Sequence, residues 1–167
     1  MNFIKKFFTS QKEEVVVDVT TERVIQEMND WVQLMQKKVP RVSKSIFFNS
    51  DNEDEFLLNL KPIHGQLGGR PSKQYYMSRI TQEVFEEDDK HLALLLDSMQ
   101  VIVEHYVAKR KKYPIKAVSE ENEIEYSYLI GAGLLNEAPR YPLYIEEFEY
   151  GYFFVTSEPQ RIKKILS

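Results

Sequence analysis

The chain has 167 residues, of which 43% are apolar, which is enough for one sizeable hydrophobic core and too few for two comfortable domains. Its 22 basic and 26 acidic residues leave a charge of −4, which argues against a dedicated nucleic-acid binder. The absence of cysteine excludes disulfides, thiol catalysis, thiolate zinc sites and iron–sulfur clusters. No apolar run approaches the roughly 20 residues of a membrane span, so we expect a soluble, cytoplasmic protein.

The first eight residues predict a short amphipathic helix with an aromatic face. Its apolar side chains are Phe3, Ile4, Phe7 and Phe8. A secretory signal needs a longer apolar run, and polar residues interrupt this one from Thr9 onward. Because four large apolar groups at one end of a chain are costly to leave in water, we expect residues 1–12 to form a docking segment. Three surfaces for it stay open: the chain itself or a second copy, a protein partner, or weakly an anionic membrane through residues 1–8.

The remainder, 13–167, predicts a single domain. A β-branched run at 15–19 predicts a strand, and a helix over 21–38 follows because its apolar residues recur with the helical period until Pro40 stops it. Two strands joined by a polar turn are expected at 45–49 and 55–60, with a further strand at 74–80.

A long helix is expected over 87–112, with a continuous apolar stripe from Leu92 to Tyr106. We favour a second, shorter helix at 125–135. The chain then closes with strands at 143–145 and 152–156 and a helix at 158–166. This irregular order predicts an α+β fold in which a small mixed or antiparallel sheet packs against the two main helices, at about 21–38 and 87–112.

Several short motifs from residue 75 onward are similar to those of a known family. They are Tyr75-Tyr76-Met77-Ser78, Phe85-Glu86-Glu87, Gln100, Tyr113-Pro114 and the terminal aromatic strand. Over roughly 55–160 the chain resembles a family of small uncharacterised proteins of Gram-positive bacteria. The resemblance implies no activity, and it supports the one-domain α+β interpretation.

The glycine-rich loop over 62–73 is the first candidate for a ligand site. Its candidate groups are His64, Gly65, Gly68, Gly69, Arg70 and Lys73. Glycines allow backbone N–H groups to converge on an anion such as phosphate. The loop lacks the Gly-Lys-Ser/Thr of a P-loop, and Pro71 with a following strand denies it a helix N-terminus. A flexible surface connection is therefore the simpler interpretation.

The stretch 119–150 is strongly acidic and contains interleaved tyrosines. Such a surface suits docking to a basic protein partner, because tyrosine is enriched at interfaces and charge steers encounter. We expect Glu146, Glu147 and Glu149 to contribute to this face. An ordinary solvated surface, with the tyrosines half in the core, is the alternative.

Charged runs flank the long helix, with acids at 86–89 and bases at 109–112. The helix dipole favours this arrangement and explains both runs. His91 and His105 would lie about 21 Å apart along one helix and cannot share a metal ion. We expect no metal site, no cofactor and no catalytic residues.

Two interpretations stay open. The first, which we favour because no catalytic signature is present, is a non-enzymatic interaction or regulatory module that contacts a protein partner or forms a homo-oligomer. The second is a small-molecule or anion-binding protein, or an enzyme, that uses the loop over 62–73.

Overall fold

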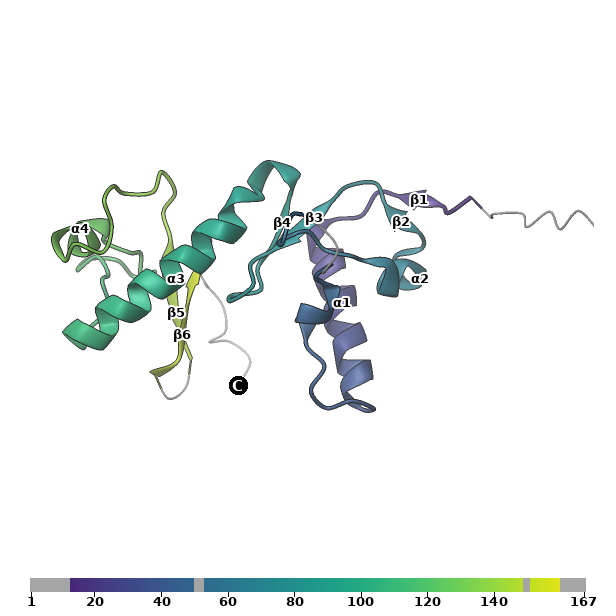
Figure 1. Cartoon of the computed structure of the whole chain (residues 1–167), viewed down its shortest axis with the longest axis horizontal. Helices are drawn as coiled ribbons and strands as arrows, with labels where there is room; N and C mark the ends of the chain where they lie inside the picture. Colours follow the sequence, from purple (N-terminus) through teal and green to yellow (C-terminus); the bar gives the residue numbers. More distant parts are fainter. Residues whose placement is uncertain (1–12, 50–52, 149–150, 160–167) are drawn as a thin grey trace, which may run out of the picture.

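The computed structural model describes residues 13–49, 53–148 and 151–159, and Figure 1 shows their arrangement. Helices are combined with three separate two-stranded pairs, which confirms the predicted α+β class. The elements described are β1 (Val16–Val17), α1 (Thr21–Gln36), α2 (His64–Leu67), β2 (Arg70–Pro71), β3 (Tyr75–Met77), β4 (Val84–Glu86), α3 (His91–Arg110), α4 (Tyr126–Gly131), β5 (Tyr144–Glu147) and β6 (Phe153–Thr156). The β1–β2 pair is parallel, and the β3–β4 and β5–β6 pairs are antiparallel. The expected sheet is thus divided into three small pairs.

The first main helix, α1, begins where the sequence predicts. Thr20 caps it, because its hydroxyl accepts a hydrogen bond from the N–H of Arg23 (3.3 Å). The buried residues of its inward face are Val24, Met28 and Val32. Trp31 is half-buried beside them, and its ring meets that of Phe47 edge-to-face at 5.4 Å between centroids. The helix predicted for 21–38 is confirmed, with its end at Gln36.

The strand expected at 45–49 is wrong, because Lys44–Phe47 forms a turn of 3-10 helix. Ser43 initiates the turn by accepting a hydrogen bond from the N–H of Ser45 (3.4 Å). The turn places Phe47 in the core with no exposed surface. A short apolar run has no period long enough to distinguish a strand from a buried turn, which is why the sequence misled here.

The segment at 55–60 is extended but makes only isolated bridges. Leu58 pairs with Phe48, and Leu57 pairs with Tyr76. It therefore lines β3 without adding a full strand to the β3–β4 pair.

Two hydrophobic clusters lie next to each other, and β4 borders both. The first cluster contains the inward residues of α1, α2 and β3, and the second those of α3, α4, β5 and β6. Val84 belongs to the first cluster and Phe85 to the second, because successive residues of a strand point to opposite faces. The strand β4 therefore contributes side chains to both hydrophobic clusters and forms the boundary between them.

The second main helix, α3, lies across the β5–β6 pair (Figure 1). It is continuous, as predicted, although the first residues of the expected range form a 3-10 turn over Glu87–Asp89. It ends at Lys111, which adopts a left-handed conformation (φ 58°) while its N–H bonds the carbonyl of Val107 (2.8 Å).

The last part of the chain follows the prediction less closely. α4 is shorter than the expected helix at 125–135, since Gly133 turns the chain at φ 71° and Leu134 N–H bonds back to the carbonyl of Leu129 (3.0 Å). The closing hairpin is confirmed by β5 and β6. Most of the helix expected at 158–166 lies outside the described residues.

Candidate functional site

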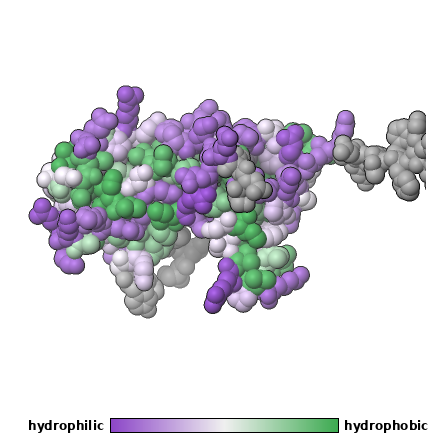
Figure 2. Space-filling model, in the orientation of Figure 1, coloured by the Kyte–Doolittle hydropathy of each residue, from purple (hydrophilic) through white to green (hydrophobic). Residues whose placement is uncertain are grey.

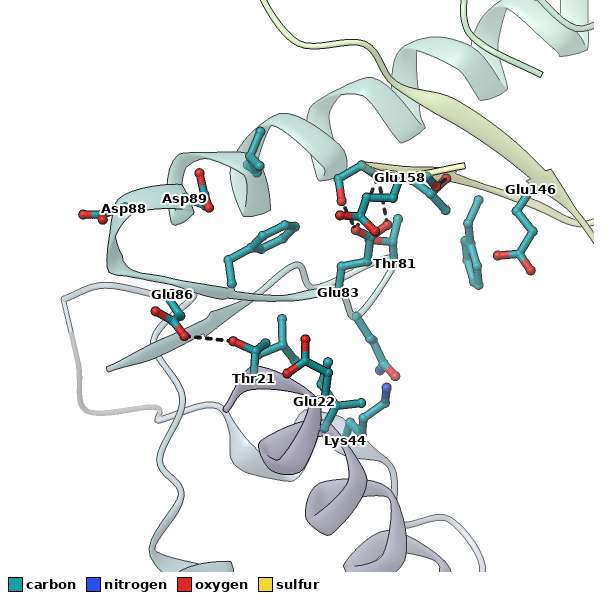
Figure 3. Close-up of a pocket in the computed structure, with 18 of the residues that line it drawn as sticks. Thr21, Glu22, Lys44, Thr81, Glu83, Glu86, Asp88, Asp89, Glu146 and Glu158 are labelled. Carbon is teal, nitrogen blue, oxygen red and sulfur yellow. Dashed lines mark hydrogen bonds between the residues drawn. The ribbon is translucent and has the colours of Figure 1, made fainter. Parts of the chain in front are cut away.

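An acidic cleft of about 910 Å³ lies where the two halves of the molecule meet. Its walls are the start of α1, the strand β4 with the turn before it, the start of α3, and the β5–β6 pair. Seven carboxylate side chains from the described residues line it: Glu22, Glu83, Glu86, Asp88, Asp89, Glu146 and Glu158. Figure 3 shows that they come from opposite walls rather than from one run of sequence.

Glu86, at the end of β4, accepts hydrogen bonds from side chains of two other segments of the chain. Thr21, the first residue of α1, donates its hydroxyl hydrogen to Glu86 Oε1 (3.1 Å; Figure 3). Lys73 Nζ lies 3.0 Å from Glu86 Oε2, and this contact lowers the pKa of Glu86. A side-chain hydrogen bond therefore joins strand β4 to helix α1 at this edge.

Glu83 lies deeper, beside the end of β6. Its carboxylate accepts hydrogen bonds from the N–H of Ser157 (3.1 Å) and from the Ser157 hydroxyl (2.5 Å). Burial nevertheless raises the pKa of Glu83 above its usual range, with the charges of Glu158 and Glu146 adding to the rise. The interior of the cleft is thus an environment in which a further negative charge is unfavourable and a cation is stabilised.

Lys44 is the single basic residue among the described residues that line the cleft. It lies in the 3-10 turn next to α1, on the same side as Glu22 (Figure 3). Burial lowers the pKa of Lys44. One ammonium group against seven carboxylates leaves the lining strongly negative.

An aromatic pair gives the cleft an apolar part. The rings of Phe148 and Phe154 meet edge-to-face, with centroids 5.3 Å apart. Phe154 is directly across from Glu146 in the β5–β6 register, so the aromatic ring and the carboxylate share one face of the hairpin. An amphipathic cationic group, such as an arginine or lysine side chain with its aliphatic stem, matches this combination.

The acidic face expected along 119–150 is divided by the alternation of β5. Glu146 faces the cleft, whereas Glu147 points to the other side and accepts a hydrogen bond from the hydroxyl of Tyr113 (3.0 Å). Glu149 lies outside the described residues.

Sequence reasoning missed most of the cleft, because its acids come from separate segments. The run at 86–89 was explained by the helix dipole, and the 3-10 turn at the start of α3 is consistent with that explanation. Only the hairpin and the shared strand β4 bring Asp88, Glu83, Glu146 and Glu158 around one space. A clue was available in the number of acids close to strand ends.

The loop expected to bind an anion has its own local structure. His64–Leu67 forms α2, and the ring of His64 is hydrogen-bonded to Glu14. The backbone N–H groups of Gly68, Gly69 and Arg70 donate to carbonyls within the chain, at 3.3, 2.8 and 2.8 Å. Gly65 lies inside α2, and Lys73 is engaged with Glu86 as described above. Anion binding here stays a prediction, and these three amides give it no support.

The remaining site predictions concern the N-terminal segment, metals and membranes. Phe3, Ile4, Phe7 and Phe8 lie outside the described residues. Within the described ranges, no group of three or more histidine or acidic side chains is placed to hold a metal ion. In the same part of the chain, no helix is long and apolar enough to cross a membrane.

Fold and cleft together define a small α+β protein with an acidic recess between its two cores. The chain belongs to a family described as a protein of unknown function (DUF3939), which matches residues 14–155. The expected membership in an uncharacterised family is thereby confirmed, over a longer range than the motifs at 55–160 implied. A Gram-positive origin stays a prediction. No curated protein and no solved structure matches the chain.

Proposed function

We propose that this protein is a non-enzymatic interaction module whose acidic cleft receives a basic segment of a partner protein. The observation that carries the proposal is the lining itself, with seven carboxylates, one lysine and an aromatic pair around about 910 Å³. A segment that alternates Lys or Arg with apolar residues would satisfy both parts of this lining. Its cations would relieve the mutual repulsion of the carboxylates.

The alternative, a small-molecule or anion site in the loop over 62–73, has less support. The amides that would have to face the anion already donate within the chain, and Lys73 is engaged with Glu86. A cytoplasmic location agrees with a protein-docking role and is part of the proposal.

The test is a binding titration with a fluorescein-labelled peptide of alternating arginine and leucine. We expect the full chain to bind it in a salt-sensitive manner, because screening weakens contacts between exposed charges. The double variant Glu22→Lys/Glu158→Lys should weaken binding at least tenfold.

A matched pair, Glu120→Lys/Glu137→Lys, makes the same change of charge outside the cleft. It should leave the affinity within about twofold of the wild-type value, since distant exposed charges are largely screened. Equal losses in the two double variants would show that net charge alone attracts the peptide. A loss of affinity in the Glu120→Lys/Glu137→Lys variant only would indicate that the peptide binds to the stretch 119–150 outside the cleft. Either result would refute docking in the cleft.

A further inference from the structure

The chain that follows β6 leaves the described structure at the wall of the acidic cleft. Ser157, the first residue after β6, is held by Glu83, whose carboxylate accepts its N–H (3.1 Å) and its hydroxyl hydrogen (2.5 Å). Glu158 lines the cleft, and Figure 3 shows it close to Glu83. The hydroxyl of Thr156 donates to the carbonyl of Glu158 (2.9 Å) and adds a second contact here. The residues beyond Pro159 therefore start from a fixed point in the cleft.

The sequence beyond this point has the composition that the cleft lining favours. The segment 160–167 contains three basic and no acidic side chains, and the basic residues are interleaved with apolar ones. These residues are Arg161, Ile162, Lys163, Lys164, Ile165 and Leu166. Cations with apolar neighbours match a surface that combines carboxylates with the Phe148–Phe154 ring pair.

Part of the acidic lining has no basic partner within the described ranges. None of the ion pairs there involves Asp88, Asp89 or Glu158. Lys44 is the single basic residue of the lining that the structure describes. Three cations added to this space would reduce the repulsion among its carboxylates, so the charges of the cleft and of the segment 160–167 are complementary.

The segment is also long enough to cross the cleft. Six extended residues span about 20 Å, roughly twice the edge of a cube of about 910 Å³. Figure 2 shows the surface indented on the lower side of this view, between the half with α1 and the half with β5 and β6. A chain that leaves β6 at Pro159 can enter the cleft without rearrangement of either half.

The other basic and apolar segment of the chain, 1–12, is less well placed. It leads into β1, and no residue of β1 lines the cleft. The segment 160–167, by contrast, follows directly on Glu158, which does.

We infer that residues 160–167 occupy the acidic cleft of their own chain and compete there with the basic segment of a partner. The competition rests on the proposed function, whereas occupation of the cleft does not require a partner. A short tether gives the segment an effective concentration on the order of millimolar, so weak contacts are sufficient to fill the cleft for part of the time. The affinity for a partner is then reduced in proportion to the fraction of molecules whose cleft is free.

Cross-linking of the wild-type full chain tests the occupation directly. A water-soluble carbodiimide joins a lysine amine to a carboxylate that is in contact with it, and mass spectrometry identifies the linked residues. We expect Lys163 or Lys164 to be joined to Glu22, Asp88 or Asp89. The reaction is run on a mixture of unlabelled and ¹⁵N-labelled chains, and we expect the links to lie within one molecule.

Three results of this experiment would overturn the inference. Links between labelled and unlabelled chains would show that a second copy supplies the segment. Links to the cleft from Lys5 or Lys6, in place of those from 160–167, would assign the cleft to the N-terminal segment. Equal yields at the exposed carboxylates of Glu120 and Glu137, which lie outside the cleft, or no links at all, would show that the cleft is not the preferred site.

The competition is tested with the labelled arginine–leucine peptide described above. The full-chain variant Arg161→Gln/Lys163→Gln/Lys164→Gln removes the cations of the segment. It should bind the peptide at least threefold more tightly than wild type, because the cleft is free in more of the molecules.

A matched triple variant, Lys37→Gln/Lys38→Gln/Arg41→Gln, removes the same three charges from exposed residues outside the cleft. It should leave the affinity for the peptide within about twofold of wild type, since distant exposed charges are largely screened. Equal tightening in both triple variants, or none in either, would refute the competition.

The two experiments separate this inference from the proposed function. Peptide binding in the cleft without cross-links from 160–167 would retain the proposed function and overturn the inference. Cross-links from 160–167 without peptide binding, even in the variant that lacks the three cations of the segment, would retain the occupation of the cleft and overturn the proposed function.

Discussion

At the residue scale, one buried amide joins α3 to the closing hairpin. Gln100 is 1% exposed. Its Oε1 accepts a hydrogen bond from the N–H of Val155 (2.7 Å), and its Nε2 donates to the carbonyl of Phe153 (3.0 Å). Both partners belong to β6, whose ladder with β5 leaves these groups unpaired. A single side chain therefore completes the hydrogen bonding of this strand edge.

Replacement of this amide should be costly. In Gln100→Leu two strand groups lose their partners, and each unsatisfied buried group costs about 1–3 kcal/mol. We expect the free energy of unfolding to fall by about 2–4 kcal/mol in a urea titration. Ser98→Ala, on the exposed side of the same helix, should change it by less than about 0.5 kcal/mol. Similar stabilities for the two variants would contradict the role assigned to Gln100.

Glu83 should leave a signature in the pH dependence of stability. Burial raises the pKa of Glu83 in the folded chain, so the folded state binds this proton more tightly than the unfolded state. The stabilising contribution is therefore fully present at low pH and is lost as the pH rises through the folded pKa. Urea titrations between pH 4 and 7 should show wild type losing stability relative to Glu83→Gln as the pH increases.

Glu86 provides a control of opposite sign. The hydrogen bond from Lys73 lowers the pKa of Glu86, so its stabilising contribution is present at neutral pH and is lost as the pH falls through the folded pKa. Wild type should gain stability relative to Glu86→Gln as the pH rises. Parallel curves for the two comparisons would show that burial does not govern Glu83.

At the element scale, Gly69, which follows α2, allows two backbone segments to approach closely. A Cβ on Gly69 would lie 2.3 Å from the carbonyl oxygen of Val15, which itself accepts the N–H of Arg70 in the β1–β2 pairing. Gly69→Ala should therefore separate β1 from β2 and lower stability by about 2 kcal/mol. Gly65, inside α2, has no atom within 4 Å of the corresponding position.

Gly65→Ala is thus the matched control for this prediction. Alanine in a helix is favoured over glycine by about 0.5–1 kcal/mol, so the variant should be as stable as wild type or slightly more stable. Thermal melting of the two variants measures the difference. An equal loss at both positions would mean that the loop needs both glycines for a reason other than contact with β1.

The elements that could be predicted from sequence are those in which the segment's own hydrophobic pattern is sufficient to identify a helix or a strand. The apolar periods of 21–38 and 87–112 are long enough to identify α1 and α3 without knowledge of their partners. The closing strands β5 and β6 follow from alternation and a turn. Short segments were harder, since Lys44–Phe47 becomes a 3-10 turn in order to insert Phe47 between α1 and its neighbours.

The candidate site was largely hidden from sequence reasoning for a physical reason. Its carboxylates lie on segments as distant as Glu22 and Glu158, and no local pattern reports that the fold brings them around one space. Among the carboxylates that line the cleft, Glu146 alone was selected in advance as part of an acidic face. Alternation along β5 placed its neighbour Glu147 on the opposite side.

At the scale of the whole molecule, β4 determines whether the two cores behave as one. Val84 and Phe85 are consecutive residues that enter different clusters, and Glu86 bonds to α1 at the same strand. Hydrogen bonds also connect the loop that precedes β4 to helix α3. Asp97 accepts hydrogen bonds from the N–H groups of Arg79 (2.9 Å) and Ile80 (3.0 Å). Loss of packing in one core should therefore propagate to the other.

Leu96→Ala tests this coupling, because Leu96 is fully buried in the second cluster and Trp31, the single tryptophan, reports on the first. Truncation of a buried leucine costs about 2–5 kcal/mol. If the cores unfold together, the urea midpoint followed by Trp31 fluorescence should fall as far as the midpoint followed by far-ultraviolet circular dichroism, which is dominated by the helices. Met28→Ala in the first cluster should shift both signals in the same way. A Trp31 midpoint that stays at its wild-type value in Leu96→Ala would show that the halves unfold separately and that β4 is a linker between them rather than a shared wall.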